Sequence, residues 1–130
     1  MPKELSTEVR AVVESTAIGH LATVLPDGSP HSVPIWVDTE GSYVVFLTGP
    51  ESRKARNLRQ DPRVALSLTA PDNPFLPVTL RGRVVDWLDG DAAWTIVDRV
   101  AMKYIGQPYD RNLERVVALI EVDHHTVGVR

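Results

Sequence analysis

The sequence has 130 residues, a length that suits one domain with its own hydrophobic core. Its formal net charge of −3 at pH 7 argues against general nucleic-acid binding, and the lack of cysteine excludes disulfides, thiolate catalysis and cysteine-ligated zinc. No apolar run approaches the roughly 18 residues of a membrane span, and the first residues lack the apolar stretch of a secretion signal. We therefore expect a cytoplasmic protein that makes no contact with membranes.

The first half of the chain is predicted to form one helix and then three strands. In residues 6–16, Val9, Val12 and Val13 have the spacing of a single helix face. The pair Asp27-Gly28 lies between two apolar runs, which is a hairpin signal. The connections are short, so the strands are expected to be antiparallel. The three strands are predicted at residues 18–25, 30–38 and 43–48.

The second half is predicted to alternate between helices and strands. Gly82 is a candidate bulge inside a long strand, and Gly106 is a plausible end for a helix whose face carries Trp94, Val97 and Ala101. About six antiparallel strands with two to four helices, all in one domain over residues 1–130, indicate a small β-barrel with helices packed on it. The elements of this half are helices at 52–60 and 89–106 and strands at 63–70, 78–88 and 115–130, the last as one strand or two.

The helix at 52–60 carries positive charge at the end where the helix dipole already places positive charge. Arg53 and Lys54 lie in its first turn, next to Ser52, which can cap it. A bound phosphate would turn their repulsion into charge-assisted hydrogen bonds. The alternative is a solvated helix whose basic side chains extend into water. Arg56 and Arg59 lengthen the positive track, while Ala55 and Leu58 are expected to face the barrel.

The order of these segments resembles the pyridoxamine 5′-phosphate oxidase-like superfamily of split β-barrel, FMN-binding-like proteins. The block SRKARNLRQDPRVAL, residues 52–66, is the most specific part of the resemblance, and the hairpin before it is less specific. The sequence is most similar to the small actinobacterial members that use coenzyme F420, a deazaflavin. True pyridoxamine phosphate oxidases end in an arginine-containing segment that grips the substrate phosphate. No such segment is visible here, which makes vitamin synthesis an unlikely role.

The resemblance implies a set of site residues. The basic stretch that binds the cofactor phosphate falls on Ser52, Arg53 and Lys54, with Asn57 beside it, and Thr48 falls near the ribityl-phosphate arm. The strand under the tricyclic ring falls on Val33, Pro34, Ile35 and Trp36. The segment KYIGQPY resembles a stretch on the substrate side, where the candidates are Lys103, Tyr104 and Tyr109.

The resemblance also implies an activity and a partner. It implies an oxidoreductase that transfers a hydride between coenzyme F420 and a small organic molecule, with FMN as the alternative cofactor and a non-catalytic carrier as the alternative class. A homodimer with the cofactor at the subunit interface is expected, and no side chain is assigned a catalytic role. The residues themselves also favour a dimer, because a barrel of this size is expected to leave Trp36 and Trp87 exposed unless a partner subunit covers them.

No metal site is predicted. His124 and His125 are adjacent, so in a strand they point to opposite faces, and none of the four histidines has a ligand-like spacing. His20 and His31 flank the first hairpin and have the potential to meet across it. No nucleophile motif or nucleotide-binding glycine loop is present.

Overall fold

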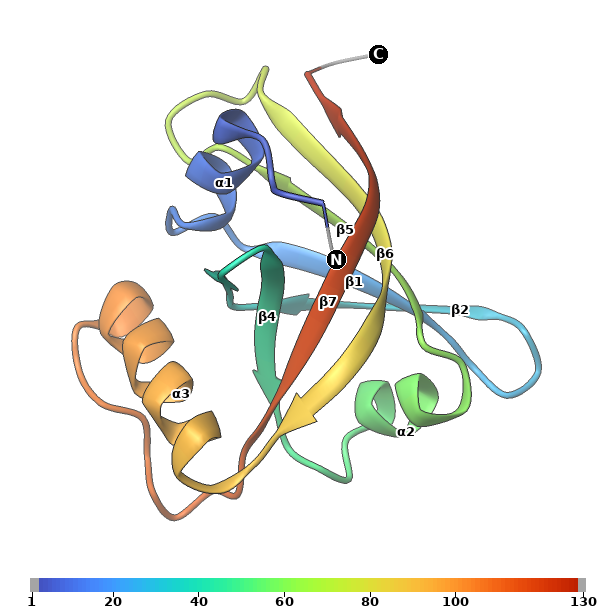
Figure 1. Ribbon diagram of the computed structural model, residues 1–130, viewed down its shortest axis with the longest axis vertical. Coiled ribbons are helices and arrows are strands. Elements are labelled where there is room, and N and C mark those ends of the chain that lie inside the picture. Colours follow the sequence, from blue (N-terminus) through green and yellow to red (C-terminus); the bar gives the residue numbers. More distant parts are fainter. Residues whose placement is uncertain (1–2, 129–130) are drawn as a thin grey trace.

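The computed structural model describes residues 3–128. Seven antiparallel strands form one curled sheet, a half-barrel accompanied by three helices (Figure 1). In chain order the elements are α1 (Thr7–Val13), β1 (Gly19–Val24), β2 (Pro30–Ile35), β3 (Val37–Glu40), β4 (Tyr43–Thr48), α2 (Arg53–Gln60), β5 (Arg63–Thr69), β6 (Pro77–Leu88), α3 (Gly90–Ile105) and β7 (Val116–Val127).

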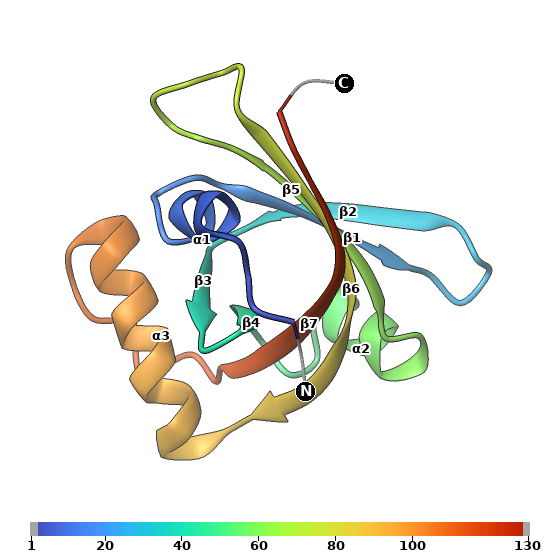
Figure 2. The same ribbon diagram turned by 45° about the horizontal axis from the view of Figure 1, so that its top comes forward.

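The sheet order is β2-β1-β5-β6-β7-β4-β3, so its two edge strands are consecutive in the chain. The sequence predicted one strand over residues 30–38, and this was wrong. The chain leaves β2, which pairs with β1, and enters β3, which pairs with β4, so the ladder breaks at Trp36. Because one residue joins the two edges, the sheet has to curl until they meet (Figure 2). The split barrel predicted from the sequence is confirmed.

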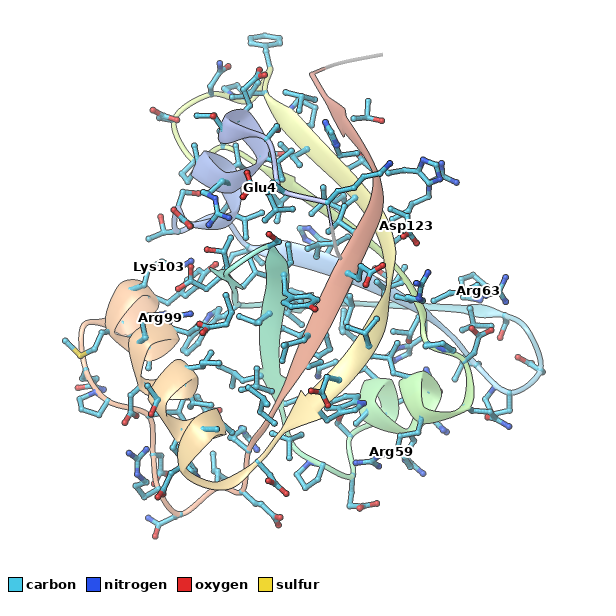
Figure 3. All side chains as sticks on the ribbon, viewed as in Figure 1. Glu4, Arg59, Arg63, Arg99, Lys103 and Asp123 are labelled. Carbon is cyan, nitrogen blue, oxygen red and sulfur yellow. The ribbon has the colours of Figure 1, made fainter. Side chains whose placement is uncertain are left out.

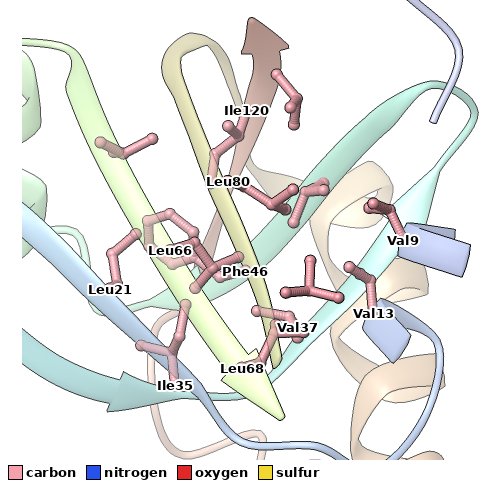
Figure 4. Close-up of a cluster of buried hydrophobic side chains, with 14 of the residues drawn as sticks. Val9, Val13, Leu21, Ile35, Val37, Phe46, Leu66, Leu68, Leu80 and Ile120 are labelled. Carbon is pink, nitrogen blue, oxygen red and sulfur yellow. The ribbon is translucent and has the colours of Figure 1, made fainter. Parts of the chain in front are cut away.

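The interior of the curled sheet holds the larger hydrophobic core (Figure 4). Helix α1 contributes Val9 and Val13 to this core, as the sequence predicted, and packs against the strands at one end of the barrel. Successive residues of a strand point to opposite faces, so β4 and β7 also present side chains outward. Those residues form a second core with α3, which includes Val45, Val97 and Val117.

The bulge predicted at Gly82 is confirmed. The pairing of β6 with β7 shifts register between Arg81 and Gly82. A Cβ at position 82 would lie 2.0 Å from the carbonyl oxygen of Glu121, which is closer than any side chain tolerates. Gly106 is likewise confirmed as the end of α3, where its φ of 71° lies in the left-handed region.

Within residues 3–128, every helix is too short or too polar to cross a lipid bilayer.

Candidate functional site

A cavity of about 680 Å³ lies at the end of β4, within the size range of small-molecule sites. The pairing registers explain why residues far apart in sequence meet there. Thr48 at the end of β4 pairs with Val116 at the start of β7, and Val37 of β3 pairs with Phe46. The lining residues are Pro34, Ile35, Trp36, Leu47, Thr48, Gly49, Pro50, Glu51, Ser52, Lys54, Tyr109, Glu114 and Arg115.

The first turn of α2 forms one wall of the cavity. Ser52 caps the helix, as predicted, because its hydroxyl oxygen accepts a hydrogen bond of 3.2 Å from the backbone N–H of Ala55. The Thr48 hydroxyl donates to the same oxygen at 2.8 Å, which ties the end of β4 to the helix. The N–H groups of Arg53 and Lys54 have no acceptor inside a helix at these positions.

Lys54 is half-buried against the cavity without a carboxylate partner. No ion pair to Lys54 is formed among residues 3–128, although Glu51 and Glu114 also line the cavity. Burial lowers the pKa of Lys54, and the positive charge of Arg115 lowers the pKa further. Arg53 does not line the cavity, but its Nε is buried with no hydrogen-bond partner in the described chain. These unpaired cations fit a phosphate group.

Part of the cavity lining is aromatic. Trp36, at the junction of β2 and β3, stacks on Tyr104 with a centroid distance of 5.2 Å and an interplanar angle of 4°. Tyr109 meets Trp36 edge-on, with centroids 6.2 Å apart. Two rings therefore hold the Trp36 indole in one orientation. A cavity lined by both aromatic rings and cations suits a ligand that combines a flat ring with an anion.

The cavity brings together a subset of the residues proposed from the sequence. Val33, Arg53, Asn57, Lys103 and Tyr104 lie outside its lining. The proposed residues that line it are Pro34, Ile35, Trp36, Thr48, Ser52, Lys54 and Tyr109.

Asn57 points away from the cavity, into the protein. It is fully buried, and its Nδ2 donates to the Thr23 hydroxyl of β1 at 3.0 Å. Its Oδ1 has no partner in the described residues. The inward, buried side of α2 consists of Ala55, Asn57 and Leu58. Asn57 therefore attaches α2 to the barrel.

Lys103 and Tyr104 serve the attachment of α3 rather than the lining of the cavity. The Lys103 ammonium donates to the carbonyls of Val13 and Val37, so it joins α3 to α1 and β3 (Figure 3). Burial lowers the pKa of Lys103, and burial raises the pKa of Tyr104. The Tyr104 hydroxyl donates to the carbonyl of Ala17 at 2.6 Å. Tyr104 reaches the cavity only through its stack on Trp36.

The positive track predicted along α2 does not continue into the cavity. Arg56 and Arg59 are exposed, and the Arg59 guanidinium lies 5.8 Å from the ring centroid of Trp87. The second cation at the cavity is instead Arg115, which the sequence did not single out. The signal was available only through the pairing of β4 with β7, because that register puts residue 115 beside Gly49.

His20 and His31 are not paired with each other across the first hairpin. His31 pairs across the hairpin with Thr23 and His20 pairs with Pro34, so the predicted option of a contact between them is not realised. Among residues 3–128, no three metal-ligating side chains gather at one point.

The sequence matches the model of the family described as pyridoxamine 5′-phosphate oxidase over residues 5–127. The chain belongs to this family. The resemblance to this family that residues 52–66 and the preceding hairpin indicated is therefore confirmed. No match was found among curated proteins.

Several solved structures resemble this member of the pyridoxamine 5′-phosphate oxidase family. An F420 reductase is 28% identical with a TM-score of 0.79, and the match covers 90% of this chain and 94% of that one. A conserved hypothetical protein from Mycobacterium tuberculosis is 26% identical with a TM-score of 0.76, covering 98% of this chain and 86% of that one. A putative pyridoxamine 5′-phosphate oxidase from Listeria innocua shares the fold at 20% identity and a TM-score of 0.71, covering 90% and 92%.

Proposed function

We propose that this protein is an oxidoreductase that binds coenzyme F420 in the cavity at the end of β4 and transfers a hydride between it and a small organic molecule. The observation that carries the proposal is a cavity of about 680 Å³ lined both by aromatic rings and by the half-buried Lys54 ammonium, which forms no ion pair among residues 3–128. The similarity to an F420 reductase supports the choice of a deazaflavin.

The residues of the chain would divide the work of binding. Pro34, Ile35 and Trp36 offer a flat apolar surface for a tricyclic ring, and Lys54 offers a charge-assisted hydrogen bond to a phosphate. The deazaflavin supplies the hydride chemistry when it is bound. The protein then needs to place the ring and keep water away from it, and no catalytic triad is required.

FMN is the second candidate cofactor, and one observation favours it. Arg59 lies over Trp87 outside the cavity, so Lys54 and Arg115 are the only cations among the residues that line it. Two cations suffice for a single phosphate, whereas the deazaflavin tail carries a phosphodiester and several glutamates. The other basic residues of α2, Arg53, Arg56 and Arg59, lie outside the cavity lining.

Two titrations decide between these cofactors. In titrations of the purified protein followed by absorbance or fluorescence, we expect coenzyme F420 to bind more tightly than FMN. Reduced F420 should then be consumed with a quinone, an enone or a tetrapyrrole as acceptor. Tight FMN binding with no detectable F420 binding would overturn the proposal in favour of a flavin enzyme. F420 binding without turnover of any of these acceptors would favour a carrier.

A further inference from the structure

Arg115 stands where the segment after α3 meets β7. We call residues 106–115 the return segment, because it runs back along α3 before β7 begins (Figure 1). The pairing of Thr48 with Val116 places Arg115 beside Gly49, at the entry to α2. A Cβ at Gly49 would lie 3.3 Å from Arg115 Nη1, so the guanidinium closely approaches the backbone of this loop.

The guanidinium of Arg115 is held by contacts that leave part of it free. Its Nε donates to the Tyr109 hydroxyl at 3.0 Å, and its Nη1 donates to the carbonyl of Glu114 at 2.7 Å. Within residues 3–128, Nη2 donates to no protein acceptor, and Arg115 forms no ion pair with a carboxylate. A half-buried arginine at a cavity wall therefore keeps donors for a ligand.

Tyr109 owes its position to α3. Its backbone N–H donates to Asp98 Oδ1 at 3.3 Å, and the other carboxylate oxygen of Asp98 accepts from Arg111 at 2.6 Å. The Arg111 guanidinium covers the ring of Trp94 at 4.0 Å. These contacts fix the return segment on α3, and the Tyr109 hydroxyl passes that fixed position on to Arg115.

Arg115 of the return segment and Lys54 of α2 line one cavity, and neither forms an ion pair with a carboxylate in the described part of the chain. Their proximity also lowers the pKa of Lys54. The two positive charges repel each other in the free protein. An anion bound by both side chains would replace this repulsion with attraction to each of them. The carboxylates of Glu51 and Glu114 also line the cavity, but neither pairs with these cations.

We infer that Arg115 joins Lys54 as a second cation for a phosphate monoester or diester, and that Tyr109 is the positioning residue that holds Arg115 for it. The inference deepens the proposed function, on which it rests for the identity of the molecule that carries the phosphate. Inorganic phosphate is itself a probe of the site, so the test does not depend on that identity.

The experiment compares ligand pairs that differ only in the phosphate. Riboflavin is measured against FMN, and the deazaflavin riboside against coenzyme F420, with wild type and Arg115→Ala. Loss of one charge-assisted hydrogen-bonding group should lower the affinity for the phosphorylated ligands by roughly ten- to a hundred-fold. Ligands without phosphate should keep their affinity. The matched control is Arg81→Ala, which removes an exposed side chain outside this cavity and should change the affinity for neither ligand.

The role of Tyr109 is tested by a double-mutant cycle. Tyr109→Phe keeps the ring that lines the cavity and removes only the oxygen that accepts from Arg115. We expect Tyr109→Phe to lower the affinity for FMN several-fold in the wild-type background. It should have no further effect in the Arg115→Ala background, since the effects of coupled residues are non-additive. An equal effect in both backgrounds would show that Tyr109 does not act through Arg115.

Inorganic phosphate separates this inference from the proposed function. At constant ionic strength, phosphate should raise the melting temperature of wild type more than chloride does, and Arg115→Ala should lose this difference. If phosphate behaves in this way while F420 does not bind, the anion site stands and the F420 proposal fails. The inference is overturned if F420 binds with equal affinity to wild type and Arg115→Ala. It is also overturned if Arg115→Ala lowers the affinity for riboflavin as much as the affinity for FMN.

Discussion

At the scale of single residues, Lys54 offers the sharpest measurement. The chain has only the lysines Lys3, Lys54 and Lys103, so NMR of labelled lysine side chains resolves each titration. We expect phosphate to raise the pKa of Lys54, because an anion favours the charged form. Arg115→Ala should also raise it, by removing a like charge. Lys103 is the internal control, since burial lowers its pKa as well but it lies away from the cavity. Equal responses of both lysines would contradict the site.

The same lysine makes stability depend on pH with a definite sign. Its folded pKa is lowered by burial first and by Arg115 second, so the unfolded chain binds the proton more tightly. The free energy of unfolding should therefore rise with pH between the lowered folded pKa of Lys54 and its ordinary value of about 10.4. Urea unfolding across this interval should show a smaller rise for Lys54→Met. An identical pH dependence in both proteins would exclude this contribution.

Residues with a local signal could be predicted from the sequence, whereas residues that depend on strand register could not. Ser52 and Lys54 follow from a helix start, and they lie where that pattern put them. Arg115 enters the cavity because β4 pairs with β7 far along the chain, and nothing around residue 115 indicates this. Asn57 does not line the cavity although it lies one helical turn from Lys54, because its side chain donates to Thr23 of β1 instead.

At the scale of elements, the N-terminus of α2 combines a structural and a binding role that two substitutions separate. Ser52→Ala removes the cap and should cost about 1 kcal/mol of stability. Ser52→Asp keeps a cap, and its charge suits the helix dipole, so stability should be retained. The added carboxylate should nevertheless weaken FMN and F420 by repelling their phosphate. Chemical denaturation and ligand titration of both variants give the two readouts. Wild-type affinity in the Asp variant would place the phosphate elsewhere.

Strand β6 depends on one glycine. A Cβ at position 82 would meet the carbonyl oxygen of Glu121 at 2.0 Å and two further backbone atoms of β7, which cannot move aside as a side chain can. Gly82→Ala should therefore cost about 3 kcal/mol or more, measured by urea denaturation. The neighbouring Arg81→Ala, an exposed position on the same strand, should stay within about 0.5 kcal/mol. A mild effect at Gly82 would mean that the bulge rearranges.

Most element positions could be predicted from the sequence because apolar spacing and turn residues are local. The helices around Val9, in residues 53–60 and before Gly106 all form near their expected bounds. The break between β2 and β3 was missed because the apolar run continues through Trp36 without a turn signal. Only the exchange of strand partners, from β1 to β4, interrupts the ladder, and pairing partners are a long-range property.

At the scale of the whole molecule, the homodimer remains a prediction. Trp36 is half-buried between Tyr104 and Tyr109, and Trp87 is half-buried against Phe46 and Arg59. The chain itself therefore covers part of each indole, which weakens the support that the two tryptophans give to a dimer. A different part of the molecule now supports the prediction, namely the hairpin of β1 and β2, which projects from the barrel (Figure 1).

The hairpin extends beyond the strand that supports it. Strand β1 pairs with β5 only over His20–Ala22, whereas its pairing with β2 continues to Val24 and Pro30. Two strands alone are marginally stable in water, and β2 is an unpaired edge of the sheet. A largely apolar hollow of about 410 Å³ lies between this hairpin and β5, lined in part by Ala65. A second copy of the chain seated there would support the hairpin.

We therefore predict a homodimer whose interface includes the hollow beside β1 and β2. Sedimentation at micromolar concentration should give the mass of two chains, because an apolar hollow and an unpaired edge are both features that subunit contacts cover. Ala65→Glu would bury a charge in that contact and should shift the protein toward monomer. Phe75→Glu is the matched control, since it places the same charge on an exposed apolar residue in the loop between β5 and β6, outside the hollow. A monomeric wild type would refute the dimer, whereas a dimer disrupted by Phe75→Glu and not by Ala65→Glu would move the interface to the β5–β6 loop.

Because β2 ends at Pro34 and Ile35 in the wall of the cavity, a subunit docked along β2 would also lie next to the proposed cofactor site. Ala65→Glu should then weaken F420 binding together with dimerisation, and the weakening should be relieved as protein concentration rises.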